Sequence, residues 1–399
     1  KHCSRPRRAR AMVSPCVAEP PPPPEAHPCA EGAEGRRRRK KANAADRKRR
    51  AVEELLERVV GAAAFQEAVR ERIGGDLGEG PAALAALFQE LRPAPVDWAA
   101  LPPALTPHLS DLSTLQGDHE LLAAEATRQR KLRKKLLRKV EDGELDEAGM
   151  AERLAKHGRG DDEEGAMLLS AGRAERKRQQ VESLACVLQG WAARRGPAGG
   201  TVLDAGCGSG NLCLPLARLL PGLRFVLLDR NAVSLDLARA RAIDGGLENV
   251  EVVQHELCAA DCASPPGAVP AFDLAIGLHC CGGLTDLVME LCRARGADCA
   301  VAPCCNGGIG RGITEAGAAE AGVAYPRSQA LARLVSREEY CEVLCPAADD
   351  LSHYGAKCLV ELDRGLAASG SLRLLRLSPA TCSPKHHVVV VERTPREAE

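Results

Sequence analysis

The sequence is poor in aromatic residues and has no long apolar stretch. Only 4 Phe, 3 Tyr and 2 Trp occur among 399 residues, which counts against a single-stranded nucleic-acid platform built from several stacking rings. No run of 18 or more apolar residues exists, so a membrane-spanning helix is excluded. The net charge is zero, with 54 Lys plus Arg against 54 Asp plus Glu. Hydrophobic residues still make up 45% of the chain, enough for a sizeable core.

A secretory signal is also missing from this stretch of chain. The basic start Lys1–Arg10 leads into no apolar segment, so we expect the 18 Cys to be reduced thiols in the cytoplasm, most of them acting as small apolar side chains. An Arg-rich start also fits an organellar transit peptide, and basic clusters also fit nuclear import. Because the sequence begins at Lys1, we expect a fragment, a processed product or an incomplete gene product.

The balanced charge conceals an uneven distribution. Residues 1–50 hold 15 Lys or Arg against 5 Asp or Glu, with a proline run at Pro20–Pro24, so residues 1–45 are predicted to be a disordered basic tail. Residues 46–172 are predicted to be a charged helical region, including a long helix over Asp118–Val140. Its basic clusters and those that flank it either bind RNA phosphates or form a solvated surface: Arg36–Arg50, Arg128–Lys139 and Arg173–Arg178.

Residues 173–395 are predicted to form an α/β domain. Short apolar runs alternate with helical stretches, a pattern typical of a Rossmann-like, seven-stranded parallel sheet with helices on both faces. We expect strands at Thr201–Asp204, Arg224–Asp229, Val250–Gln254, Leu274–Leu278, Cys299–Pro303, Cys358–Leu362 and Val388–Glu392, and helices near Leu212–Leu220, Ala232–Gly245 and Gly283–Gly296. The last two strands are expected to supply an antiparallel edge.

A glycine-rich turn after the first of these strands carries the chemistry. The sequence Val202–Asn211 places Asp204 at the strand end, followed by Gly206, Gly208 and Gly210, which permit positive φ and close approach of a ligand. Asp229 ends the next strand, 25 residues after Asp204. A carboxylate there suits ribose hydroxyls, whereas an acid directly before the glycines repels a pyrophosphate. S-adenosyl-L-methionine (SAM), with a cationic amino-acid end and no phosphate, fits best. The structural alternative is that both acids only cap their loops.

The ends of the next three strands complete the predicted site. Glu256 follows the third strand, where it would accept from an adenine amino group, or else be an exposed loop acid. The fourth and fifth strands lead into two cysteine doublets, and the carboxyl ends of neighbouring parallel strands line one crevice. The expected members of an acceptor pocket are His279, as base or orienting residue, with Cys280, Cys281, Cys304, Cys305 and Asn306.

Three interpretations of these doublets remain open: a pocket wall, a zinc site, or close packing at crowded strand ends. The doublets lack the two-residue gap of a zinc knuckle, so we expect no metal. No Asn/Asp-Pro-Pro-Tyr segment follows the fourth strand, which counts against an exocyclic amine or amide nitrogen as the acceptor.

Several stretches resemble the C-terminal methyltransferase-like domain of the glutathione S-transferase C-terminal domain-containing protein family. They are Glu175–Gln180, Leu278–Asp286, Pro303–Gly307, Lys357–Arg364 and Cys382–His386. The stretch from about Arg173 to Val391 is also similar to a wider group that includes the tRNA 2′-O-methyltransferases related to yeast Trm-thirteen. The resemblance implies a class I SAM-dependent methyltransferase fold, with Asp204, the three glycines and Asp229 around the cofactor. It implies no acceptor, and residues 1–172 lack a thioredoxin-like strand pattern.

We therefore expect a SAM-dependent methyltransferase, with RNA as the favoured acceptor because of the basic segments. The alternative is a non-catalytic, cofactor-binding scaffold that recruits RNA or a protein partner. A metal or redox role of the Cys doublets is the third hypothesis.

Overall fold

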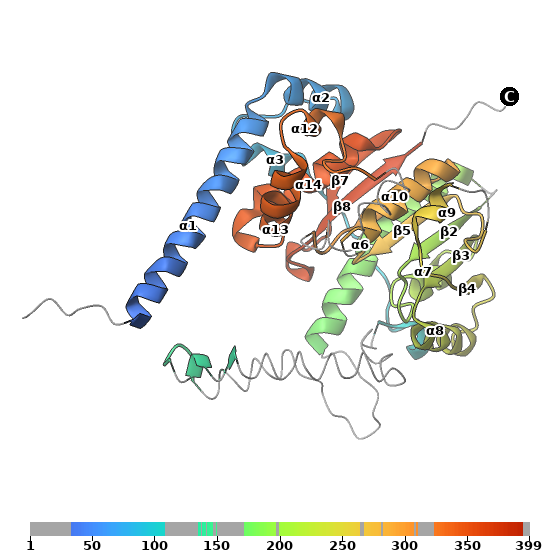
Figure 1. Ribbon diagram of the computed structural model, residues 1–399. Coiled ribbons are helices and arrows are strands. Elements are labelled where there is room, and N and C mark those ends of the chain that lie inside the picture. Colours follow the sequence, from blue (N-terminus) through green and yellow to red (C-terminus); the bar gives the residue numbers. More distant parts are fainter. Residues whose placement is uncertain are drawn as a thin grey trace, which may run out of the picture. The chain divides into compact units, whose positions relative to one another are not determined.

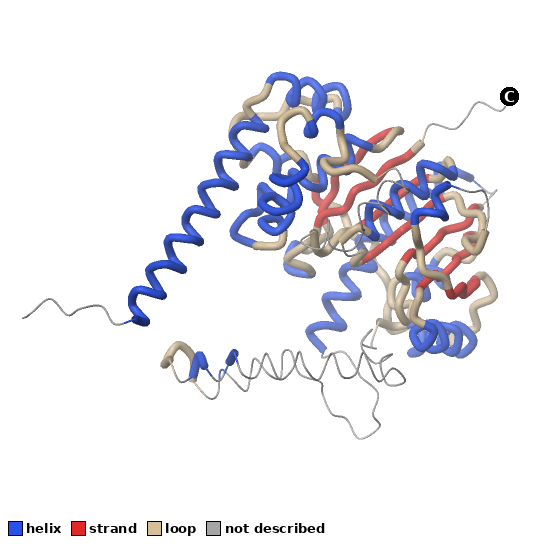
Figure 2. Tube along the Cα trace, in the orientation of Figure 1, coloured by secondary structure: helices blue, strands red, loops and turns tan. Residues whose placement is uncertain are grey.

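The structure is a computed structural model that describes residues 33–107, 135–136, 138–140, 142–146, 149, 171–196, 199–263, 267–280, 282–306, 309 and 323–393. It divides into two compact units, Lys1–Arg47 and Lys48–Glu399. The second unit contains one eight-stranded sheet with helices on both faces (Figures 1 and 2). The predicted Rossmann-like α/β class is therefore confirmed.

The sheet has the strand order β1-β7-β8-β6-β5-β2-β3-β4. Its strands are β1 (Gln89–Glu90), β2 (Gly200–Ala205), β3 (Leu223–Asp229), β4 (Val250–Gln254), β5 (Leu274–Leu278), β6 (Asp298–Ala302), β7 (Ser371–Arg376) and β8 (His387–Glu392). Strands β2 to β6 are parallel, and β8 is antiparallel to β6 and β7. The order reverses at β2, which has β3 on one side and β5 on the other, so a crevice is expected at its carboxyl end.

Helices connect these strands and precede them. They are α1 (Ala33–Val60), α2 (Ala63–Ile73), α3 (Ala83–Ala86), α6 (Ala171–Arg195), α7 (Cys213–Leu219), α8 (Ala232–Asp244), α9 (Ala259–Ala263), α10 (Leu284–Arg295), α12 (Gln329–Ala332), α13 (Cys345–Ala348) and α14 (Tyr354–Ala367). In the part of the chain that the structure describes, no helix combines the length and apolarity needed to cross a membrane.

Two apolar clusters form the core, one on each face of the sheet. Successive strand residues point to opposite faces, so Val202 joins the cluster under α6, α7 and α8, whereas Leu203 joins the cluster under α2, α10 and α14. The last three turns of α1 also belong to the second cluster, through residues such as Val52 and Val59, both fully buried. The central strands are thus covered on both faces, and their carboxyl edge remains for a site.

The structure differs from the prediction on the side of the sheet that contains β8, β7 and β1. The predicted strand Cys358–Leu362 lies inside helix α14, and the strand beside β8 is β7, further along the chain. The apolar run in α14 resembles a strand, but its charged residues are spaced for one helical face. Strand β1, which pairs with β7 in parallel, adds an eighth strand that was not expected.

The predicted N-terminal regions are described only in part. Helix α1 begins at Ala33, so its first turns overlap the tail predicted to be disordered over residues 1–45, while residues 1–32 lie outside the described residues. Most of the helix predicted over Asp118–Val140 also lies outside them.

Candidate active site

The loop after β2 folds tightly over the end of β3. Gly206, Gly208 and Gly210 have φ of 74°, 55° and 79°, a region that side chains other than glycine rarely adopt. The backbone amides of Gly206 and Cys207 donate to the Leu228 carbonyl at 2.8 and 3.1 Å. These bonds hold the loop close to β3. Because its three glycines have no side chains, a ligand can approach the main chain of the loop.

Two predicted acids lie at the carboxyl ends of adjacent strands. Asp204 is the penultimate residue of β2 and is only 2% exposed. Asp229 ends β3, where its Oδ2 accepts from the backbone amide of Gly208 and its Oδ1 from that of Asn231, both at 2.9 Å. A carboxylate oxygen can accept more than one hydrogen bond, so the Asp229 carboxylate is fixed in orientation and still has acceptor capacity.

Two pockets meet at Asp229, and Asp204 lines the first of them. The first has a volume of about 290 Å³ and extends from Asp204 and the glycine loop to Lys177 of α6. The second, of about 600 Å³, extends from Asp229 past Leu257 and Leu284 to Cys305. They share four lining residues, and together they form one crevice along the carboxyl edge of the parallel strands: Gly206, Asp229, Arg230 and His279.

Glu256 borders the second pocket but is not buried. Its side chain is 69% exposed and forms an ion pair of 3.0 Å with Arg230, whose side chain is 73% exposed. The apolar part of this pocket comes instead from Leu257, Leu284 and Leu287.

His279 follows β5 and lines both pockets. Its backbone has a φ of 68°, the one positive value at a non-glycine residue in the described part of the chain, and such strained backbone is concentrated at functional sites. Its amide donates to the Ala302 carbonyl at 3.0 Å. Its ring Nε2 lies 3.2 Å from Oε1 of Gln180 in α6.

The predicted cysteines have unequal environments. Cys280 is 2% exposed, and burial raises the pKa of its thiol well above the ordinary value, so the thiol stays protonated. Cys304 and Cys305 are half-buried, with their sulfurs 3.8 Å apart, and Cys305 lines the second pocket. Cys281 lies outside the described residues. Among the residues that are described, no group of three or more His, Cys, Asp or Glu is arranged to hold a metal ion.

Asn306 lies beneath the crevice rather than in its wall. It is fully buried, donates from Nδ2 to Glu361 at 3.1 Å and accepts at Oδ1 from Arg364 at 3.0 Å. Neither pocket includes it among its lining residues. Its predicted role in the acceptor pocket is therefore replaced by one in a buried polar network.

That network fastens the loop after β6 to α14. Arg364 forms ion pairs of 2.9 Å with both Asp286 and Glu361, and all three side chains are fully buried. Lys357 donates to Glu361 at 2.6 Å and to the Pro303 carbonyl at 3.1 Å. These bonds fix the backbone that leads into Cys304 and Cys305.

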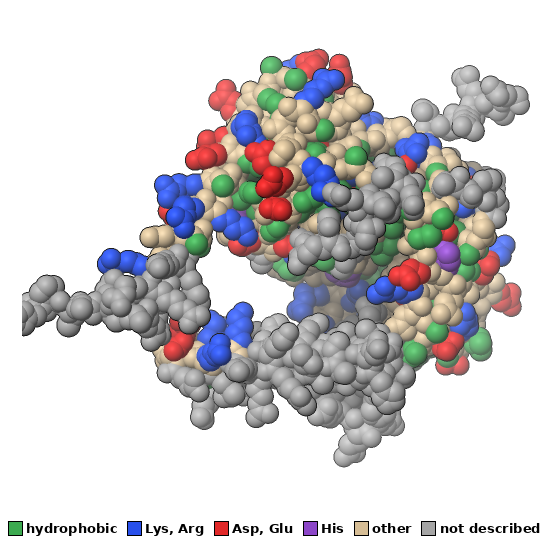
Figure 3. Space-filling model, in the orientation of Figure 1, with side chains coloured by type: hydrophobic (Ala, Val, Ile, Leu, Met, Phe, Trp, Pro, Cys, Tyr) green, Lys and Arg blue, Asp and Glu red, His purple; other side chains and the backbone are tan. Residues whose placement is uncertain are grey.

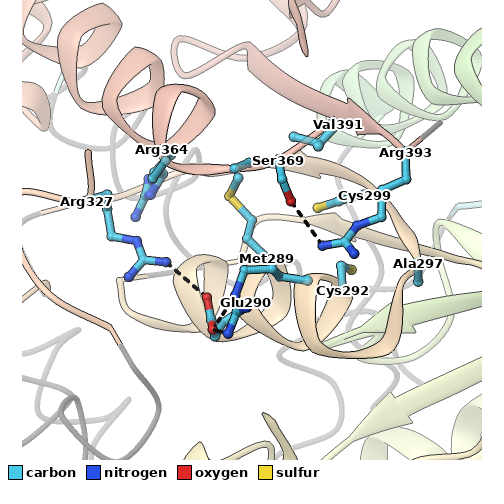
Figure 4. A pocket seen from close by; sticks show the side chains of 13 residues that line it. Met289, Glu290, Cys292, Ala297, Cys299, Arg327, Arg364, Ser369, Val391 and Arg393 are labelled. Carbon is cyan, nitrogen blue, oxygen red and sulfur yellow. Dashed lines mark hydrogen bonds and ion pairs between the residues drawn. The ribbon is translucent and has the colours of Figure 1, made fainter. Parts of the chain in front are cut away.

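A small cavity lies beside the same network. It measures about 20 Å³, which accommodates nothing larger than a water molecule. Figure 4 shows Arg327 extending toward Glu290 on α10, with nitrogen and oxygen 3.6 Å apart, and Arg364 on the neighbouring helix. We regard this cavity as part of the packing.

Sequence reasoning missed three contributions to the site. Lys177 lines the first pocket from α6, and Gln180, three residues further along the same helical face, contacts His279. The third is the buried ion network of α14. The signal for that network was the spacing of Lys357, Glu361 and Arg364 by four and three residues, which places them on one face of a helix.

Part of the chain is similar in sequence to known proteins. Residues 197–290 match the methyltransferase domain family. The chain is 30% identical over 235 residues to the glutathione S-transferase C-terminal domain-containing protein of Bos taurus, covering 56% of this chain and 34% of that protein. The homolog of Drosophila melanogaster is 29% identical over 234 residues, covering 55% and 37%. The chain thus spans about a third of the length of the curated relatives it matches.

Solved structures also align with parts of the chain. Magnesium protoporphyrin IX methyltransferase from Synechocystis, solved with bound SAH, has a TM-score of 0.27 and 19% identity over 42% of this chain and 70% of that chain. PKMT2 from Rickettsia typhi, solved with AdoHcy, has a TM-score of 0.22 and 19% identity over 26% of this chain and 20% of that chain. The match of residues 197–290 identifies a methyltransferase domain, for which SAM is the implied methyl donor, within a chain related to the glutathione S-transferase C-terminal domain-containing proteins.

Proposed function

We propose that the crevice binds SAM and that the chain transfers its methyl group to RNA. The observation that carries this proposal is the continuous crevice at the carboxyl edge of β2, β3 and β5, with a buried acid at one end and apolar side chains at the other. SAM has the matching polarity, from a charged amino-acid end through a ribose to a flat, largely apolar adenine. When bound, it supplies an electrophilic methyl group on a sulfonium.

The first pocket suits the amino-acid end of SAM. Asp204 offers a carboxylate for the ammonium group, and the glycine loop lets the ligand approach the main chain. Lys177 lies in the same pocket and offers an ammonium to the ligand's carboxylate. The first pocket thus has a carboxylate and an ammonium in its lining, which match the two charges of a zwitterionic ligand.

The second pocket suits the nucleoside end. Asp229 lies between the two pockets, where its oriented carboxylate can accept from ribose hydroxyls. Leu257, Leu284 and Leu287 provide apolar contacts for adenine, and Glu256 at the rim can accept from its amino group. The exposure of Glu256 makes its expected contribution the smallest of these.

His279 is the residue best situated to receive a proton from the acceptor. It lines both pockets, so it stands where the methyl-bearing centre of the ligand would lie between them. Cys305 lines the second pocket on the acceptor side, and the sulfur of Cys304 lies 3.8 Å from that of Cys305. A proton acceptor is needed only for a group such as a hydroxyl, which loses a proton as it gains a methyl.

Basic side chains on α6 favour RNA as the acceptor. Arg173, Arg176, Lys177 and Arg178 follow one another within six residues, and Lys177 opens into the first pocket. Figure 3 shows blue Lys and Arg side chains in the region of α6. Such side chains contact phosphates without reading bases, which is compatible with the scarcity of aromatic residues. The alternative, a cofactor-binding scaffold without turnover, has the same surface.

Replacement of Asp229 tests the cofactor site. Asp229→Ala removes the carboxylate that fits the ribose and the acceptor of the Gly208 amide, so we expect SAM affinity to fall by at least about tenfold, or 1.4 kcal/mol. Isothermal titration calorimetry measures this. Asp236→Ala, on α8 where the 74% exposed side chain of Asp236 pairs with Arg239, is the matched control. Unchanged affinity of Asp229→Ala would remove the site assignment.

Methyl-labelled SAM tests catalysis and the acceptor. The full chain is incubated with total RNA, and separately with protein extract, and the labelled class is identified. Labelled RNA supports the proposal; labelled protein would redirect it to a protein acceptor. SAM binding without any labelled product would favour the scaffold.

A further inference from the structure

Gln180 links α6 to two loops at the carboxyl edge of the sheet. Gln180 is 5% exposed. Both the nitrogen and the oxygen of its side-chain amide have a hydrogen-bond partner. Nε2 donates to the carbonyl of Cys382 at 2.9 Å, and Oε1 lies 3.2 Å from Nε2 of His279. Because a carbonyl only accepts, the amide must present its NH2 group to Cys382 and its oxygen to the imidazole.

We propose that Gln180 is a positioning residue that fixes the tautomer of His279. The amide oxygen of Gln180 only accepts, so Nε2 of a neutral His279 must carry the hydrogen. The lone pair of the ring then lies on Nδ1. The inference about catalysis rests on the proposed function, in which His279 receives the acceptor's proton; the tautomer itself does not.

Hydrogen bonds to neighbouring elements hold the backbone at both ends of this link. The amide of His279 is bound to Ala302 in β6, as described above. On the other side, the amide of Ser378 donates to Oγ of Ser183 at 3.0 Å, and this hydroxyl lies 3.0 Å from the carbonyl oxygens of both Gln179 and Ser378. Ser183 lies one turn beyond Gln180 on α6, so the same helix holds the loop that carries Cys382. The hydrogen bond to His279 is therefore made by a preorganised group.

The tautomer determines which atom receives the proton. During transfer, the acceptor's bond to hydrogen breaks and its electron pair forms the bond to the methyl carbon, while the methyl–sulfur pair remains on sulfur. The released proton goes to Nδ1 of His279, which becomes an imidazolium with both nitrogens protonated. Gln180 continues to accept from Nε2, so the ring keeps its orientation through the step.

Nuclear magnetic resonance of the ligand-free chain tests the tautomer directly. With histidine labelled by ¹⁵N, two-bond nitrogen–hydrogen correlations at about pH 8.5, above the ordinary histidine pKa, distinguish a proton on Nε2 from one on Nδ1. The chain has 10 His, and the signal that disappears in His279→Asn is that of His279. We expect the Nε2–H form alone. A proton on Nδ1 would overturn the proposal, and this measurement requires no Gln180 variant.

Two substitutions of Gln180 separate the role of its amide oxygen, which accepts from His279, from that of its amide nitrogen, which donates to Cys382. Gln180→Met has a similar volume but removes both bonds, so we expect both tautomers; Gln180→Glu keeps an acceptor and should retain Nε2–H. Gln179→Met, at the neighbouring residue whose side chain donates a hydrogen bond to Glu175, is the control. Identical tautomer populations in the wild type and Gln180→Met would overturn the proposal.

A kinetic arm separates this inference from the proposed function. At saturating SAM, Gln180→Met should methylate total RNA at least about tenfold more slowly, with SAM affinity within about twofold. If SAM affinity in Gln180→Met fell by as large a factor as the methylation rate, the role of Gln180 would be merely structural. If the wild type fails to bind SAM while His279 still carries its hydrogen on Nε2, the proposed function fails and the tautomer assignment stands.

Discussion

Arg364 is the residue on which the buried network depends. Its guanidinium contacts two carboxylates, Asp286 and Glu361, and neither they nor Arg364 have any exposed side-chain surface. Arg364→Met would leave two buried negative charges with fewer partners, and breaking a buried pair in this way costs about 3–5 kcal/mol. Urea unfolding followed by circular dichroism measures the loss.

A surface arginine provides the comparison. Arg373, whose side chain is 41% exposed, forms an ion pair with Glu392, and such exposed pairs contribute about 0–1 kcal/mol. Arg373→Met should therefore change the free energy of unfolding only slightly. If the two variants lose equal stability, the network does not hold the fold in the way described.

Glu361 makes the stability depend on pH. Burial alone would raise the pKa of Glu361, but the positive charges of Arg364 and Lys357 outweigh it and lower the pKa from 4.5 to about 2. A carboxyl whose pKa is depressed by folding stabilises the fold above its unfolded pKa, and this contribution is lost as the pH falls from 4.5 toward about 2. Glu361→Gln should flatten the acid limb of the stability curve. A limb as steep as that of the wild type would contradict this assignment.

Among the elements, those with local signals were predictable and those defined by distant contacts were not. The glycine loop, Asp204 and Asp229 lie within one strand–turn–helix unit and the next strand, so their spacing indicated the site. The contact of Gln180 with His279 joins residues 99 positions apart, and no local pattern encodes it. Helix α14 was misassigned because its apolar run reads as a strand when the partners of its charged face are unknown.

The later turns of helix α1 belong to the core of the second unit. From Val52 to Val60, five apolar residues of α1 are buried in the cluster under α14, each worth roughly 1.5–3 kcal/mol. A chain that starts at Lys48 should keep its thermal midpoint within about 2 °C. A chain that starts at Ala62 should unfold, because the loss approaches the whole stability of a typical domain.

Differential scanning calorimetry of the two shortened chains compares these expectations. The first shortened chain lacks the unit Lys1–Arg47 and retains the five buried apolar side chains of α1 described above. A large decrease in its midpoint would show that the first unit also stabilises the second.

At the scale of the whole molecule, zero net charge does not exclude a polyanionic partner, because the charge is unevenly distributed. If the basic side chains of α6 hold RNA, affinity for total RNA must fall as salt rises, since bound phosphates release their counterions. Arg176 is exposed on α6, and Arg176→Gln should weaken binding and reduce the slope of log affinity against log salt by about one.

The matched control for this test lies at the amino-terminal ends of the parallel strands, opposite the crevice. Arg224 is at the start of β3, with its side chain 64% exposed, far along the strand from the crevice at the carboxyl ends. Arg224→Gln removes the same charge from the molecule and should leave the salt slope unchanged, as measured by fluorescence anisotropy of labelled RNA. Equal slopes for the two variants would mean that net charge, rather than the α6 surface, governs binding. A selective effect of Arg176→Gln would assign the phosphate contacts to the helix that also supplies Lys177 to the crevice and Gln180 to His279.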